Sequence, residues 1–100
     1  MGTFLDREIA RSLKDPEYRA AFVDASQRHD AIDALVAHRK RQGLTQTEVA
    51  RRMGVGQPTV SEFEKEGSDP RLSTMQRYAR AVNARCVVYI EGELTPREAP

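Results

Sequence analysis

Residues 44–64, LTQTEVARRMGVGQPTVSEFE, constrain the fold more than any other part of the chain. Thr45 and Glu48 have the spacing of a capping box, which begins a helix. A Gly-Val-Gly turn follows after about two helical turns, and its second glycine, Gly56, can serve as the next N-cap. Pro58 then fits the first turn of another helix, where proline loses no helical hydrogen bond. The stretch therefore predicts two short helices joined by a tight turn, a helix-turn-helix.

The second of these helices is rich in hydrogen-bonding side chains. Val60 and Phe63 have the spacing of an inward apolar pair, which leaves the polar residues on the outward arc. A helix of this kind fits the major groove of DNA, where a glutamine can both donate to and accept from an adenine edge. The sequence therefore predicts four base contacts to double-stranded operator DNA: Gln57, Thr59, Ser61 and Glu62.

Basic residues are concentrated in the middle of the chain. Residues 31–80 carry nine Lys or Arg and six Asp or Glu, whereas each flank is net negative by one. This bias permits binding to a polyanion, although charge alone is equally compatible with a solvated surface of mixed charge. The candidate phosphate contacts are Thr45, Gln46, Arg41, Arg51, Arg52, Lys65 and Arg71.

Helical patterns also flank the central stretch. Leu5, Ile9 and Leu13 form one stripe, and Asp15-Pro16 predicts the start of a second helix. Residues 16–42 fit either one long helix or two helices with a break near residue 30. Ser73 and Gln76 form a second capping-box pattern ahead of a helix that ends near Val82. The chain is therefore predicted to be mainly all-α, a bundle of five to six helices.

The pattern changes after Asn83. The run RCVVYIEGE alternates like a β-strand, with Cys86, Val88 and Ile90 on one face and Val87 and Tyr89 on the other. A lone strand leaves its backbone groups unpaired, so the simplest partner is the same strand of a second copy, antiparallel about a two-fold axis. The alternative is an apolar tail that lies on the helices.

These patterns divide the chain into four parts. They are an N-terminal helical arm (1–30), a helix-turn-helix core (31–83), a dimerisation strand (84–92) and a disordered tail (93–100).

Several classes of protein are excluded by composition. The chain has no apolar run of membrane-spanning length and no secretory signal, and its single cysteine, Cys86, fits a reducing cytoplasm. One cysteine and two separated histidines give no metal-ligand spacing. No nucleophile or acid–base signature is present. We therefore expect a cytoplasmic protein without metal or cofactor that is not an enzyme.

The motifs GLTQ, VARRMGV, QPTVSEFE and LSTMQRYARAV occur in this order over residues 32–82, and in this combination the chain resembles the Xre family of Cro- and C1-type regulators. The resemblance implies a lambda-repressor-like bundle that binds operator DNA as a dimer. It implies that Gln46 clamps phosphate, that Gln57 and Glu62 read bases, and that Arg39 and Glu64 form a structural ion pair between helices. Pro58 departs from the polar residue that is common at its position, which implies fewer base contacts.

The arm, LDREIARSLKDPEYRAAFVDA, is similar to that of HigA-type antitoxins. This similarity implies a repressor of its own operon that also binds an RNA-cleaving toxin of the HigB/RelE type. Leu5, Ile9, Leu13, Tyr18 and Phe22 either bind the toxin or pack on the core. Two other functions stay open: a stand-alone Xre-family regulator without a toxin partner, and a protein-binding adaptor.

Overall fold

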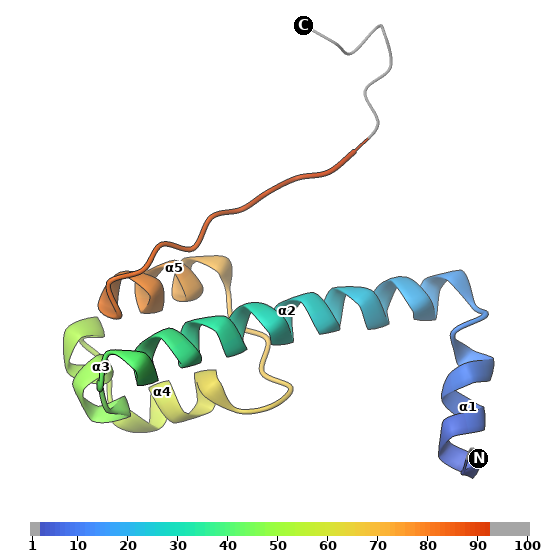
Figure 1. The fold of residues 1–100 in the computed structure, drawn as a ribbon, viewed down its shortest axis with the longest axis horizontal. Helices are drawn as coiled ribbons and strands as arrows, with labels where there is room; N and C mark the ends of the chain where they lie inside the picture. The colour runs from blue at the N-terminus through green and yellow to red at the C-terminus, as the bar shows by residue number, and fades with distance from the viewer. Residues whose placement is uncertain (1–2, 93–100) are drawn as a thin grey trace, which may run out of the picture.

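The computed structural model describes residues 3–92, and within them the fold consists of helices and connecting segments. The helices are α1 (Phe4–Ser12), α2 (Pro16–Arg41), α3 (Gln46–Met53), α4 (Gln57–Glu64) and α5 (Leu72–Ala81). Figure 1 shows α3, α4 and α5 gathered around the C-terminal half of α2, with α1 at the far end of that long helix. The prediction of a mainly helical chain with a helix-turn-helix is confirmed.

The hydrophobic core lies where the C-terminal half of α2 meets α3, α4 and α5. Tyr78 of α5 is fully buried at its centre, and its ring stacks on Phe63 with centroids 4.5 Å apart. Stacking adds to the apolar area that both rings remove from water. The other core residues are Ile32, Leu35, Val49, Ala50, Met53, Val60, Met75, Ala79, Ala81 and Val82. The bundle therefore has four helices, and α1, which buries no residue, is not one of them.

The α3–α4 turn forms as its sequence predicts. The Thr45 hydroxyl caps α3 by accepting a hydrogen bond from the backbone N–H of Glu48, 3.0 Å away. Gly54 ends α3 with a φ of 71°, a left-handed conformation that glycine adopts without steric cost. Gly56 is the N-cap of α4, and Pro58 lies in its first turn. These local signals fix the angle at which α4 leaves α3.

The start of α5 differs from the prediction. The Ser73–Gln76 capping box does not form, because the helix begins at Leu72 and its N-cap, Arg71, makes no side-chain capping bond. Pro70 lies directly before this N-cap, and its fixed φ favours an extended approach to the helix start. The sequence pattern therefore located the helix but placed its first turn too late.

Residues 16–41 form one continuous helix, which decides between the two alternatives for this region. The Asp15 carboxylate caps it by accepting from the Glu17 N–H at 2.9 Å. Only Ile32, Leu35 and Arg39 of its residues are buried, and all lie in the C-terminal half. The boundary predicted at residue 30 therefore lies inside a single helix, and the N-terminal half of α2 projects beyond the core (Figure 1).

The apolar side chains of the arm do not pack on the core. Phe4, Leu5, Tyr18, Phe22 and Val23 are all exposed. In Figure 1, α1 lies at the opposite end of α2 from α3 and α5. The apolar surface of the core is therefore out of its reach. Leu5, Tyr18 and Phe22 therefore do not pack on the core, whereas Ile9 and Leu13, the other two residues of that set, are half-buried.

The strand predicted over residues 84–92 is not present in the described chain. Ala84 and Cys86 are half-buried against the core, but Val87, Val88, Tyr89 and Ile90 are exposed. A strand needs a neighbour for its backbone groups, and the described part of a single chain supplies none. Pairing across a two-fold axis stays a prediction, and the tail predicted over 93–100 lies outside the described residues. None of the described helices has the length and apolar character that crossing a membrane requires.

Candidate nucleic-acid interface

Helix α4 presents a polar arc to solvent and an apolar arc to the core. Val60 and Phe63 are 1% and 6% exposed, so they anchor the helix from behind. The four residues predicted to contact bases, Gln57, Thr59, Ser61 and Glu62, are all exposed. They lie on one short, rigid element whose orientation is set by the α3–α4 turn and by the core. This arrangement has the form of a helix that can enter a groove.

Gln57 is held by a neighbour on α3. Its amide nitrogen donates to the side-chain oxygen of Gln46 at 2.7 Å, and the Gln46 nitrogen donates to Glu64 Oε1 at 3.0 Å. A side chain fixed by a hydrogen bond loses less rotamer freedom when it later makes a contact. The structure therefore joins the residue assigned to phosphate, Gln46, with the residue assigned to base reading, Gln57.

Arg39 and Glu64 form a bidentate ion pair between α2 and α4. Arg39 Nε lies 2.8 Å from Glu64 Oε2, and its Nη2 lies 3.0 Å from Oε1. Both side chains are about nine-tenths buried. A third guanidinium nitrogen of Arg39 donates to the Leu44 carbonyl at 2.7 Å. The pair sets the position of α4 relative to α2, and it lies directly behind the Gln46–Gln57 contact.

Tyr78 completes this buried network. Its hydroxyl donates to Glu64 Oε2 at 2.7 Å. Burial and that hydrogen bond raise the pKa of the Tyr78 hydroxyl. Burial opposes ionisation of Glu64 as well, but hydrogen bonds from Arg39, Tyr78 and Gln46 outweigh it and lower its pKa. For Arg39 the cost of burial is outweighed by Glu64, so its pKa is raised.

Sequence reasoning missed the role of Tyr78 in this network, because its position on the apolar side of α5 predicts only packing. A fully buried tyrosine needs a hydrogen-bond partner for its hydroxyl, and that requirement was the available signal.

The residues predicted to contact phosphate have different surroundings. Thr45 and Gln46 lie at the N-terminus of α3, where the first N–H groups of the helix have no partner within it. Arg41, Lys65 and Arg71 are exposed, at the end of α2, after α4 and before α5 respectively. These five residues lie at or beside the ends of α2, α3, α4 and α5.

Arg51 and Arg52 are engaged within the chain. Arg51 pairs with Glu48 on the preceding turn of α3. Arg52 donates to the Ala81 carbonyl at 2.9 Å, at the end of α5. Arg77 of α5 makes the converse contact with the Met53 carbonyl, at the end of α3, at 2.6 Å. A cation at a helix C-terminus stabilises the helix dipole, so Arg52 and Arg77 hold α3 and α5 together.

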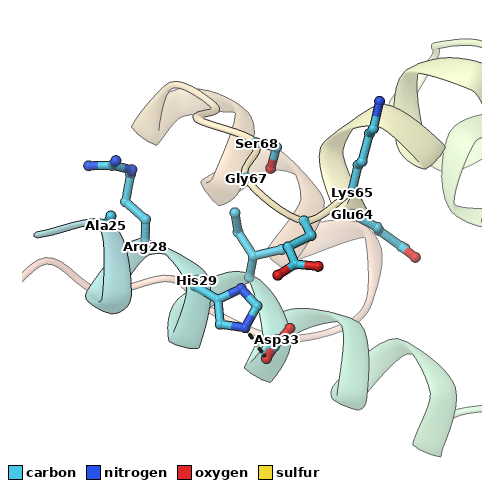
Figure 2. A pocket seen from close by; sticks show the side chains of 10 residues that line it. Ala25, Arg28, His29, Asp33, Glu64, Lys65, Gly67 and Ser68 are labelled. Atoms are coloured by element: carbon cyan, nitrogen blue, oxygen red, sulfur yellow. Dashed lines mark ion pairs between the residues drawn. The ribbon is translucent and has the colours of Figure 1, made fainter. Parts of the chain in front are cut away.

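A hollow of about 370 Å³ lies away from the polar arc of α4, between α2 and the loop after α4. Figure 2 shows His29 and Asp33, which form an ion pair, on the α2 side of the hollow, and Gly67 and Ser68 on its loop side. Its lining mixes both charges. Within residues 3–92, no cluster of three or more His, Cys, Asp or Glu side chains is placed to hold a metal ion.

Comparisons with known proteins agree with this geometry. The helix-turn-helix family matches residues 35–85. Antitoxin HigA1 of Mycobacterium tuberculosis, recorded for two strains, is 55% identical over 101 residues, which cover all of this chain and 67% of the relative. An uncharacterised helix-turn-helix transcriptional regulator of Methanothermobacter thermautotrophicus is 47% identical over 45 residues, which cover 45% of this chain and 65% of that protein. No solved structure gives a significant match. The chain therefore belongs to the helix-turn-helix family of the Xre/Cro/C1 type and is a homologue of the HigA antitoxins.

Proposed function

We propose that the chain is a DNA-binding antitoxin that represses its own operon, with α4 in the major groove of the operator. The polar arc of α4 supports this reading: four hydrogen-bonding side chains are exposed on a helix whose opposite side is anchored by Val60 and Phe63. Gln57 reads an adenine edge, and Glu62 accepts from a cytosine amine. Thr59 and Ser61 make the remaining base contacts.

Phosphate binding supplies most of the affinity in this proposal. The α3 N-terminus, with Thr45 and Gln46, binds one phosphate through its free N–H groups. Arg41, Lys65 and Arg71 bind neighbouring phosphates on either side of α4. Arg51 and Arg52 contribute less than the sequence alone indicates, because both are already engaged with partners in the chain.

The proposed unit on DNA is a homodimer. Two copies related by a two-fold axis place their α4 helices in successive major grooves of a palindromic operator. The apolar segment 84–92, which is exposed in the single chain, forms the strand that joins the two copies. Its free backbone groups and its alternating side chains are what antiparallel pairing requires.

The proposed second partner is an RNA-cleaving toxin of the HigB/RelE type. The homology with HigA1 over the whole chain supports it, and so does the exposed apolar arm. Leu5, Tyr18 and Phe22 are exposed in the single chain, and such side chains on adjoining helices fit a protein partner. We assign the arm to toxin binding and the α4 face to DNA, so one chain can hold both partners.

DNA reading is tested with Gln57→Ala. On the operator this change costs about 1–3 kcal/mol of binding free energy, whereas on random DNA of equal length it has little effect. The matched control is Gln27→Ala, an exposed glutamine on the arm half of α2. Fluorescence anisotropy at two salt concentrations measures both. Equal losses on operator and random DNA mean that Gln57 does not read bases.

The proposed toxin partner is tested by expressing the protein from its native operon and identifying by mass spectrometry any protein that co-purifies with it. A small ribonuclease that is released by Tyr18→Asp with Phe22→Asp supports the antitoxin. Operator binding with no co-purifying protein favours a stand-alone regulator. A co-purifying partner without any salt-dependent DNA binding favours an adaptor.

A further inference from the structure

The segment after α5 has the exposure pattern of a strand that lacks its neighbour. Val88 is 52% exposed, whereas Val87 and Tyr89 on either side are 71% and 76% exposed. Ala84 and Cys86, with the same parity as Val88, are half-buried against the core. From Ala84 to Val88 the even-numbered side chains therefore lie on the side of the helices and the odd-numbered ones toward solvent, whereas Ile90 is exposed in the single chain. Within the described chain, no backbone hydrogen bond joins residues 85–92 to any other segment.

Symmetry restricts how two copies of this segment can pair. A two-fold axis that relates two antiparallel strands is perpendicular to the sheet. A given residue and its copy in the second strand therefore point to the same face of the sheet. The axis must then pass beside one residue, which pairs with its own copy. Every other residue pairs with a residue of the second copy that lies the same number of positions from the central residue, in the opposite direction along the sequence. Only a few registers are possible, and each is named by its central residue.

We propose that the two-fold axis passes at Val88, so that Arg85 of one copy lies opposite Glu91 of the other. The inference rests on the homodimer proposed above and fixes its register. An axis at Val87 would place Glu91 opposite Asn83, which has a φ of 60° and does not continue a strand. An axis at Tyr89 would place Glu91 opposite Val87 and would leave Arg85 opposite Glu93, beyond the predicted strand. Within residues 84–92, only the register centred on Val88 forms two cross-strand ion pairs of opposite charge.

This register also matches apolar residues across the strands. Val87 lies opposite Tyr89 of the second copy on the solvent side, and a β-branched residue beside an aromatic ring is a favourable cross-strand pair. On the helix side, Cys86 lies opposite Ile90 of the second copy. Ile90 is 82% exposed in the single chain, more than Val87, Val88 or Tyr89, and the pairing gives this side chain an apolar neighbour.

A hollow beside the segment receives that isoleucine. It has a volume of about 500 Å³ and is lined by Gln76 and Arg80 of α5 together with residues 84–88. Its position next to Cys86 on the α5 side is where Ile90 of the second copy arrives in the register centred on Val88. The two-stranded ribbon therefore packs with its even-numbered face on α5 of both copies, which explains how so short a sheet is covered.

Disulfide trapping tests the register. In a Cys86→Ala background, Val88→Cys links to its own copy on mild oxidation, because residues at the centre of an antiparallel pair come within disulfide distance. Val87→Cys and Tyr89→Cys link poorly alone but efficiently when the two variants are mixed. A stronger self-link through position 87 or 89 overturns the register while it leaves the dimer intact.

Charge exchange gives an independent test in the unmodified background. Arg85→Glu or Glu91→Arg alone weakens dimerisation about tenfold by sedimentation, and the two changes together restore it, because the pair is re-formed with its signs exchanged. Arg7→Glu on α1 is the control and leaves the dimer unchanged. If the double exchange does not restore the dimer, Arg85 and Glu91 do not face each other. A wild-type chain that stays monomeric at every concentration instead rejects the homodimer itself.

Discussion

The two halves of α2 have the same helical pattern and opposite surroundings. Tyr18, Phe22 and Ala25 continue the stripe that Ile32 and Arg39 occupy further along the helix. Ile32 and Arg39 are buried by α4 and α5, whereas Tyr18 and Phe22 are exposed. The comparison shows that periodicity determines which face of a helix is apolar, and that other elements determine whether this face is covered. An apolar stripe that its own chain leaves uncovered is available to a partner.

Two phenylalanines give the largest expected contrast between the regions. Phe63→Ala removes a buried ring that stacks on Tyr78, and it should lower the free energy of unfolding by about 3–5 kcal/mol. Phe22→Ala removes an exposed ring and should change it by less than about 0.5 kcal/mol. Urea unfolding followed by circular dichroism measures both. A loss above 1 kcal/mol for Phe22→Ala means that the arm is packed in solution, against the core or against a second copy.

Two arginines of α2 give the next contrast. Arg39→Ala leaves the buried Glu64 carboxylate without its counter-ion and should cost about 3 kcal/mol of stability. Arg28→Ala removes a pair with Asp69 in which both side chains are well exposed, and it should cost less than about 1 kcal/mol. The same unfolding measurement compares them. Equal losses would mean that the loop after α4 ties the arm half of α2 to the core as firmly as Glu64 ties the other half.

Much of the core could be predicted from local sequence, and the predictions that failed did so for physical reasons. Thr45, Gly54 and Pro58 fixed the helix-turn-helix, because caps, left-handed glycines and first-turn prolines act within a few residues. The N-cap predicted at Ser73 lies two residues too late, because the helix takes Arg71, which directly follows Pro70, as its N-cap. The exposure of the arm's apolar side chains could not be predicted from local sequence. It depends on how far the helices of the core, which are distant in sequence, extend along α2.

The candidate site was predictable as a set of residues but not as a network. Exposed positions on α4 follow from helical spacing once Val60 and Phe63 are taken as inward. The chain of hydrogen bonds from Tyr78 through Glu64 and Gln46 to Gln57 joins residues on three helices, which no local pattern relates. The resemblance to Xre regulators predicted the Arg39–Glu64 ion pair. The structure shows that Tyr78 also donates a hydrogen bond to Glu64.

The pH dependence of stability separates the network from the exposed carboxylates of the arm. The pKa of Glu64 is lower in the folded chain than in the unfolded chain, because Arg39, Tyr78 and Gln46 donate to its carboxylate. Its contribution is therefore complete above the unfolded value of about 4.3 and is lost as the pH falls through the folded value. Unfolding titrations between pH 7 and pH 3 measure this loss. Glu64→Gln should flatten the profile, and Glu17→Gln at the start of α2 should not.

The smallest expected effect tests whether the two halves of α2 unfold together. Ala21 and Ala37 are both exposed on this helix, one in each half, and a glycine at either position costs about 1 kcal/mol of local helix stability. Ala37→Gly should lower global stability by that amount, because its half of the helix unfolds with the core. Ala21→Gly should instead speed hydrogen exchange of the amides of residues 17–29 and leave the global urea midpoint unchanged, since no residue of that half of α2 is buried. A shift of the global midpoint with Ala21→Gly would show that α2 unfolds as one unit, and the exposed arm would then transmit a partner's binding directly to the helix that positions α4.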